Sequence, residues 1–231
     1  MKLLKNTLTG LLSGSLALTA LTALAADEVQ LEGAKAGHWT MDFDAAVKTA
    51  EEKGLPLVLN FTGSDWCGWC KIMDKNVFAE KEWKDFAATN AMLVTLDFPK
   101  DKRIVPEKYV ERNTKLKGQF GVGGYPTYII LDSDGKTVLG KLGAGKEKTP
   151  STFIEEFKGL IRLSEKNVAA YIKANPDKAK AFQAAIAEAK DADKSLKDWV
   201  ATKPKRNEEN SKLFTGFQAR IKAANDALGK F

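Results

Sequence analysis

The sequence predicts an α/β protein, with a central sheet flanked by helices and a helical extension at its C-terminal end. Short apolar runs rich in β-branched residues alternate with stretches whose apolar residues recur at helical spacing, an order typical of α/β folds. A pair of cysteines follows one of these runs at the start of an expected helix. Beyond residue 164 only helical spacing remains, which indicates the extension.

The N-terminal 25 residues have the pattern of an export signal. Two lysines precede an uncharged stretch with an apolar core, and the small residues at its end suit cleavage after Ala25 or Ala26. We therefore expect residues 1–25 to be a signal peptide and the mature protein to be exported to the periplasm. An uncleaved membrane anchor is the alternative, and the Ser, Thr and Gly content argues against it. No later segment has the roughly 20 apolar residues that a membrane span needs.

Residues 26–37 are polar and are expected to be a flexible lead-in to a domain that spans residues 38–163. The first helix is predicted to start at a cap provided by Asp42 or Asp44 and to end at Gly54. The short apolar run that follows predicts a buried strand, and the Gly, Ser and Asp after it predict a turn.

The two cysteines lie directly after this turn, in the motif Trp66-Cys67-Gly68-Trp69-Cys70. Two thiols at this spacing can close a disulfide and reopen it. The helix that follows is expected to turn three apolar residues inward, Ile72, Met73 and Val77. Cys67 then lies at the helix start, where unpaired N–H groups and the helix dipole favour its thiolate. We expect Cys67 to be the exposed redox nucleophile and Cys70 to be shielded.

Other uses of the cysteine pair are less favoured. A structural zinc site needs four ligands, and the chain has two Cys and a single His, His38. A purely structural disulfide across four residues would restrict the unfolded chain little and so stabilise little. Redox chemistry is the preferred interpretation, with no metal and no organic cofactor.

The rest of the domain alternates helices and strands. In chain order, the patterns predict a helix at 80–89, a strand at 91–98, a loop with a helix at 107–117, strands at 127–132 and 136–142 that form a hairpin, and a helix at 151–163. Pro126 stands at the entry to the first hairpin strand, which is unusual because proline cannot donate a ladder hydrogen bond. A cis Tyr125–Pro126 bond is one way to accommodate it.

These residues carry a resemblance to thioredoxin-fold proteins of the exported, single-domain type. The matching segments are Asn60-Phe61, Trp66 to Lys71, Tyr125-Pro126-Thr127 and the turn Asp132 to Lys136. The resemblance covers about residues 38–163 and implies a mixed central sheet. It also implies that Cys67 attacks, Cys70 resolves, Pro126 sits in cis against the disulfide, and Tyr125 offers its backbone to an extended substrate. The rest of the substrate site would consist of Trp66, Gly68 and Trp69.

Three departures from the family pattern bear on the chemistry. The central dipeptide Gly68-Trp69 is neither Gly-Pro nor a His-containing pair, so the reductase and oxidase directions both stay open. Asn60 lies where thioredoxins often have a buried Asp that accepts a proton. Because an amide cannot titrate, either Lys71 or water would take that role or the proton transfer would be less assisted. The segment 99–118 is longer than a minimal thioredoxin requires.

Residues 164–231 are predicted to form a helical hairpin with an apolar stripe on each arm and a break at 203–207. Such a hairpin could dock on the domain, form a homodimer or hold a partner, and docking is the favoured role. The net charge of +6 is spread along the chain, with no basic block interleaved with aromatic residues, so no nucleic-acid partner is expected.

These features predict an exported thiol–disulfide oxidoreductase that reduces or exchanges disulfides through the Cys67/Cys70 pair. Its partners would be substrate proteins with disulfides or thiols, and a redox protein that exchanges electrons with the pair. One alternative is a disulfide isomerase that dimerises through the C-terminal helices. Another is a binding or chaperone module on a thioredoxin scaffold, in which the disulfide would be inert.

Overall fold

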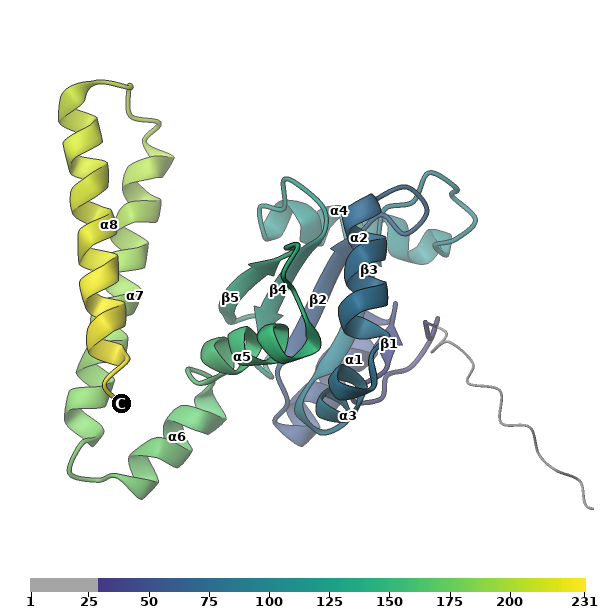
Figure 1. The fold of residues 1–231 in the computed structure, drawn as a ribbon, viewed down its shortest axis with the longest axis horizontal. Helices are drawn as coiled ribbons and strands as arrows, with labels where there is room; N and C mark the ends of the chain where they lie inside the picture. Colours follow the sequence, from purple (N-terminus) through teal and green to yellow (C-terminus); the bar gives the residue numbers. More distant parts are fainter. Residues whose placement is uncertain (1–28) are drawn as a thin grey trace, which may run out of the picture.

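The computed structural model describes residues 29–231, and the expected signal peptide lies outside the described residues. A five-stranded sheet forms the centre of the domain (Figure 1). Its strands, in spatial order, are β1 (Trp39–Thr40), β3 (Met92–Asp97), β2 (Leu57–Thr62), β4 (Thr127–Leu131) and β5 (Val138–Gly143). The first three strands are parallel, and β4 is antiparallel to both of its neighbours, so the sheet is mixed as expected.

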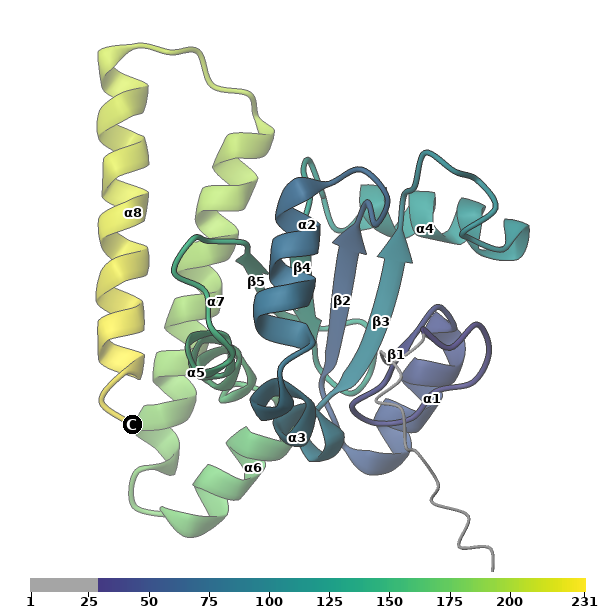
Figure 2. The same cartoon turned by 45° about the vertical axis from the view of Figure 1, so that its right-hand side comes forward.

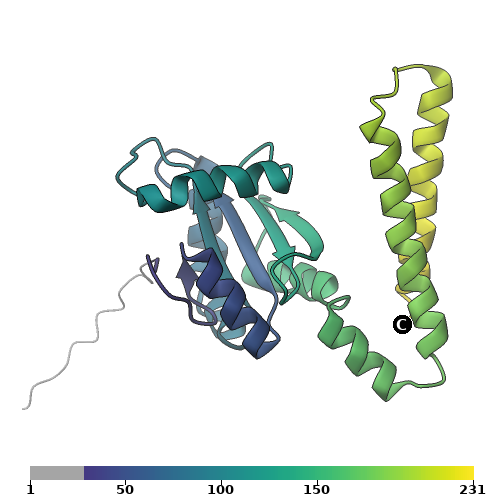
Figure 3. The ribbon, with the colours of Figure 1, turned by 180° about the vertical axis from the view of Figure 1, so that it is seen from behind.

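Helices cover both faces of this sheet (Figures 2 and 3). They are α1 (Phe43–Lys53), α2 (Gly68–Met73), α3 (Lys81–Asn90), α4 (Glu107–Gln119) and α5 (Pro150–Ile161). One core lies between the sheet and α2, α3 and α5, where Phe78, Trp83 and Phe153 pack edge to face. A second core lies between the opposite face and α1 and α4. Because both faces are covered, every residue of β2 and β3 is buried, which explains their continuous apolar runs.

The caps of α1 confirm the sequence prediction. The Asp42 side chain accepts a hydrogen bond from the Ala45 N–H, and Gly54 ends the helix in the left-handed conformation. The preceding segment is not a free lead-in within the described residues. Gln30 N–H donates to the Trp39 carbonyl, and Met41 N–H donates to the Gln30 carbonyl, so this part of residues 26–37 is tied to β1.

The helix after the cysteines differs from expectation in two ways. It changes at Met73 into a π-helical turn, η1 (Asp74–Phe78). Met73 and Val77 are buried as predicted, but Ile72 is 43% exposed, so its predicted inward position was wrong. Successive helical residues are rotated by about 100°, so the face that buries Cys70 and Met73 turns Ile72 outward.

The C-terminal residues form three helices, of which the first was not predicted: α6 (Glu165–Ala174), α7 (Ala179–Ala201) and α8 (Glu208–Leu228). The expected break falls between α7 and α8, which pack against each other as an antiparallel hairpin. Arg220 on α8 pairs with Glu188 and Asp191 on α7. No helix within residues 29–231 is long and apolar enough to cross a membrane.

The favoured docking of this hairpin on the domain was wrong. The hairpin stands beside the domain and joins it through α6 (Figures 1 and 3). Aromatic contacts at its base hold it there, with the ring of Phe182 4.4 Å from that of Tyr171 and 5.4 Å from that of Phe231. The physical reason is that the two arms take their apolar partners chiefly from each other, through Trp199 against Phe217 among other contacts, although Leu213 on α8 stays exposed.

Candidate active site

The cysteine motif lies at the carboxyl end of β2, where the chain turns into α2. The N–H groups of Trp66 and Cys67 both donate to the Gly63 carbonyl and close the turn. A Cβ atom on Gly63 would lie 2.5 Å from Cε2 of Trp66, so a glycine is needed for the indole to pack there. The strand and the turn together place Cys67 at the N-cap of α2, as the sequence predicts.

Cys67 and Cys70 form a disulfide, with their Cα atoms 5.2 Å apart. Cys67 Sγ accepts a hydrogen bond from the Cys70 N–H at 3.2 Å. In the dithiol form the same N–H would face the Cys67 sulfur and favour its thiolate. Cys67 is only 6% exposed, less than expected, because its sulfur is bonded to that of Cys70, which is 1% exposed. Cys67 is nevertheless more exposed than Cys70, which is the expected order.

The Tyr125–Pro126 bond is cis, as anticipated, and Pro126 is buried at the start of β4. β4 runs antiparallel to β2, with Thr127 opposite Phe61. The first residues of β4 and the last residues of β2 therefore share one end of the sheet. This arrangement brings the proline loop and the cysteine motif, which are far apart in sequence, to the same edge.

An aromatic platform connects these two segments. The Trp66 indole Nε1 donates to the Phe98 carbonyl at 2.8 Å, and its ring meets that of Tyr125 edge to face with centroids 5.7 Å apart. Phe98 and Tyr125 are also in contact, with centroids 5.4 Å apart. Trp66 and Trp69 are each 42% exposed beside the buried disulfide. The exposed rings, together with the exposed Gly68, leave an open apolar surface next to Cys67.

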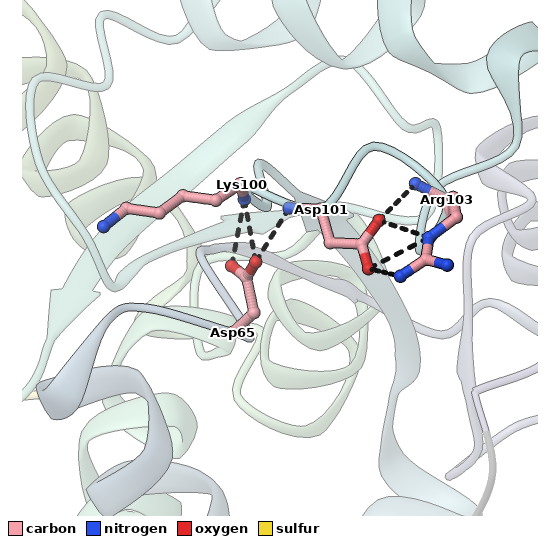
Figure 4. A network of polar contacts seen from close by, with 4 residues as sticks. All are labelled: Asp65, Lys100, Asp101 and Arg103. Carbon is pink, nitrogen blue, oxygen red and sulfur yellow. Dashed lines mark hydrogen bonds and ion pairs between the residues drawn. The ribbon is translucent and has the colours of Figure 1, made fainter.

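The loop after β3 is fastened to the cysteine turn by Asp65 (Figure 4). The Asp65 carboxylate accepts hydrogen bonds from the N–H groups of Asp101 and Lys100 at 2.9 to 3.0 Å. The bond from Asp101, supported by that from Lys100, holds the pKa of Asp65 below its ordinary value. The Asp101 carboxylate in turn accepts hydrogen bonds from Nε and Nη2 of Arg103. The beginning of segment 99–118 is thus attached directly to the active-site turn.

Beneath α2 lies a cleft of about 500 Å³ that is lined by both apolar and polar side chains. Asn60 and Thr62 on β2 project into it from the same face of the sheet, and both are less than 5% exposed. Their oxygens Asn60 Oδ1 and Thr62 Oγ1 have no hydrogen-bond partner among the described residues. Asp97 on β3 forms another part of the cleft and accepts hydrogen bonds from Ser64 N and Oγ. The cleft is roomy and polar enough for water.

Asp74 also lines this cleft and was missed by sequence reasoning. Burial of its carboxyl, with the charge of Asp97 as a second cause, raises its pKa to about 6. Its backbone N–H donates to the Cys70 carbonyl, so Asp74 lies one helical turn beyond that cysteine. This spacing of four residues is the sequence feature that could have identified Asp74 as a residue on the same helix face as Cys70. Lys71 points elsewhere, with Nζ donating to the Asp65 carbonyl at 2.7 Å. The structure therefore brings an acid, and not Lys71, to the cleft.

This geometry defines a thiol–disulfide oxidoreductase site on a thioredoxin fold, and comparison with known proteins agrees. The thioredoxin-like domain family matches residues 43–158, and the chain belongs to that family. It is 37% identical over 118 residues to "Disulfide bond reductase DsbH" of Chlamydia pneumoniae, a match that covers 51% of this chain and 69% of that protein. The chain is a thiol–disulfide oxidoreductase.

Other similar proteins carry related names. "Thioredoxin-related protein DsbJ" of Chlamydia pneumoniae is 29% identical over 113 residues, which are 49% of this chain and 32% of that protein. "Thioredoxin H-type" of Oryza sativa subsp. indica is 30% identical over 118 residues, 51% of this chain and 82% of that protein. A solved structure titled "DsbH Oxidoreductase" has a TM-score of 0.50 and 29% identity, and covers 63% of this chain and 93% of that one. Each match leaves a large part of this chain uncovered.

Proposed function

We propose that the protein is exported to the periplasm and reduces disulfides in substrate proteins. The observation that carries the thiol–disulfide exchange is the placement of Cys67 at the N-cap of α2 with the Cys70 N–H directed at its sulfur. That placement favours an attacking thiolate at Cys67. The name of the DsbH relative, a disulfide bond reductase, supports the reducing direction. The N-terminal pattern of residues 1–25 supports export.

The reaction begins with the reduced pair. The Cys67 thiolate attacks one sulfur of the substrate disulfide, a mixed disulfide forms, and the other substrate sulfur leaves as a thiolate that takes up a proton. Cys70 then loses its proton and attacks Cys67 Sγ, which re-forms the Cys67–Cys70 disulfide and releases the second substrate thiol. Two electrons pass from the pair to the substrate, and a redox partner protein returns them.

The substrate segment is held next to the pair by residues from both ends of the site. The Tyr125 backbone, ahead of the cis Pro126, offers hydrogen bonds to an extended chain. Trp66 and Trp69 offer exposed apolar contacts, and Gly68 leaves space between them because nothing lies within 4 Å of the position of a Cβ there. The proposed exchange needs no organic cofactor or metal, because the cysteine pair itself carries the two electrons.

Reduction of insulin disulfides by residues 26–231 tests the activity. Wild-type protein is expected to turn over with an external reductant, while Cys67→Ser removes turnover and Cys70→Ser accumulates a mixed disulfide. The reduction potential decides the direction, because a value near about −270 mV suits a reductase and one near about −120 mV suits an oxidant. A value near the oxidant end would reverse the proposed direction.

Export is tested separately by expressing the full chain in a bacterium and sequencing the N-terminus of the soluble periplasmic protein. We expect the mature protein to begin at Ala26 or Asp27. Recovery of uncut protein from the cytoplasm alone would contradict export without affecting the thiol chemistry.

A further inference from the structure

We propose that the surface beside Cys67 prefers disulfides flanked by acidic residues, and that Lys117 is the residue that determines this preference. The inference rests on the proposed function, because it concerns the segment that the substrate presents to the same site. The expected occupant is an extended peptide segment that carries a disulfide-bonded cysteine and a nearby Glu or Asp.

Lys117 lies in the last turn of α4 and reaches over the aromatic platform. Its Nζ is 4.9 Å from the centroid of the Tyr125 ring and 5.3 Å from that of Phe98. Cation–π contacts of this length hold an ammonium in place without neutralising its charge. No carboxylate within residues 29–231 forms an ion pair with Lys117. The platform therefore presents a fixed cation that has no anionic partner there.

The position of this cation relative to the substrate follows from Tyr125. A substrate strand that uses the Tyr125 backbone must run past the Tyr125 ring, which contacts Trp66 on one side and lies under Lys117 on another. A carboxylate on the substrate within a few residues of its cysteine can then approach the ammonium. A hydrophobic residue there would gain less, because the rings are already packed on one another.

The loop that follows β3 adds to the positive charge. In Figure 4 the Lys100 side chain extends away from both carboxylates of the network, and only its backbone N–H is used by Asp65. Asp101 is paired with Arg103, while Asp65 accepts only backbone N–H groups and keeps its single negative charge, which is fewer than the positive charges of Lys71, Lys100 and Lys117. Lys71 Nζ donates to a carbonyl, which carries no net charge. The rim on this side of Cys67 is therefore an electrostatically positive surface, which attracts acidic segments and speeds their encounter.

The test uses three disulfide-linked peptides that differ only in the residue beside the cysteine, Glu, Gln or Lys. Reduced protein, residues 26–231, is mixed with each peptide, and the second-order rate of exchange is measured at low and high salt. Each rate is divided by that of dithiothreitol with the same peptide, which removes the effect of the flanking charge on the leaving thiol. We expect the corrected rate to be about threefold to fivefold higher for Glu than for Gln, the upper part of the range for an exposed ion pair. The difference should shrink in high salt.

Lys117→Met keeps the aliphatic stem over the rings and removes the charge. It is expected to lower the ratio of the Glu rate to the Gln rate to about half of its wild-type value or less, with the remainder due to Lys71 and Lys100. The matched control is Lys190→Met, an exposed lysine on α7, which should leave all three rates unchanged. Circular dichroism checks that both variants are folded.

Equal corrected rates for the three wild-type peptides would overturn the charge preference. An undiminished preference in Lys117→Met would overturn the assignment to Lys117. Neither result would contradict the proposed function, because the protein would still exchange disulfides with the peptides. Absence of exchange with every peptide and with insulin would instead remove the proposed function, and this inference with it.

Discussion

Replacement of Asp74 by Asn is expected to stabilise the folded protein at neutral and alkaline pH. The carboxyl of Asp74 lies in the cleft beneath α2, where burial and the charge of Asp97 raise its pKa from an ordinary 3.8 to about 6. Ionising this group in the folded state is therefore unfavourable. An amide at the same position resembles the protonated carboxyl and avoids that cost.

The pH dependence follows from the direction of the shift. Between about pH 4 and 6 the folded protein keeps the Asp74 proton that the unfolded chain releases, so stability falls as pH rises through this window and stays lower above it. A full shift from 3.8 to 6 corresponds to about 3 kcal/mol at 1.36 kcal/mol per pH unit. The carboxyl faces the cleft but the residue as a whole is exposed, so solvent screening reduces this figure, and we expect about 1 kcal/mol.

Urea unfolding of the disulfide form at pH 4 and pH 8 measures this effect. The Asn variant should be about 1 kcal/mol more stable than wild type at pH 8, or about 2–4 °C higher in Tm, and equal to it at pH 4. The matched control is Asp193→Asn, an exposed position on α7, which should change little at either pH. A gain of the same size at both pH values, or none at pH 8, would refute the reasoning.

Three other changes probe the site and its surroundings. Asp65→Asn should free the loop after β3, since an amide oxygen cannot hold its N–H groups as a carboxylate does, and hydrogen exchange of the loop amides should rise severalfold. In wild type the depressed pKa of Asp65 means that this attachment is present above the ordinary pKa and is lost as pH falls through the lowered one. Alkylation of the reduced protein across pH should label Cys67 before Cys70, and early labelling of Cys70 would contradict the assigned roles. A chain ending at Ser164 should fold and keep its exchange rate per folded molecule, because α7 and α8 pack mainly on each other. A folded truncation without exchange would show that the hairpin takes part in the chemistry.

The sequence by itself determined the local structure of the site. The cap at Asp42, the stop at Gly54 and the start of α2 at Cys67 each depend on a few neighbouring residues, so local patterns are enough to find them. The cis bond before Pro126 was anticipated for a similar reason, because a proline at a strand entry is restricted by its own chemistry. Strands β2, β3 and β4 were also visible because their runs are largely apolar, whereas the two-residue strand β1 was not predicted.

Only the tertiary structure decided which distant residues meet. Lys117 reaches Tyr125, and Asp74 shares a cleft with Asp97, through the packing of elements whose sequence separation carries no signal of contact. The outward position of Ile72 likewise depends on how α2 lies on the sheet. The hairpin shows the same limit most clearly. Its amphipathic stripes require apolar partners but do not specify which ones, and in the folded chain the two arms pack on each other.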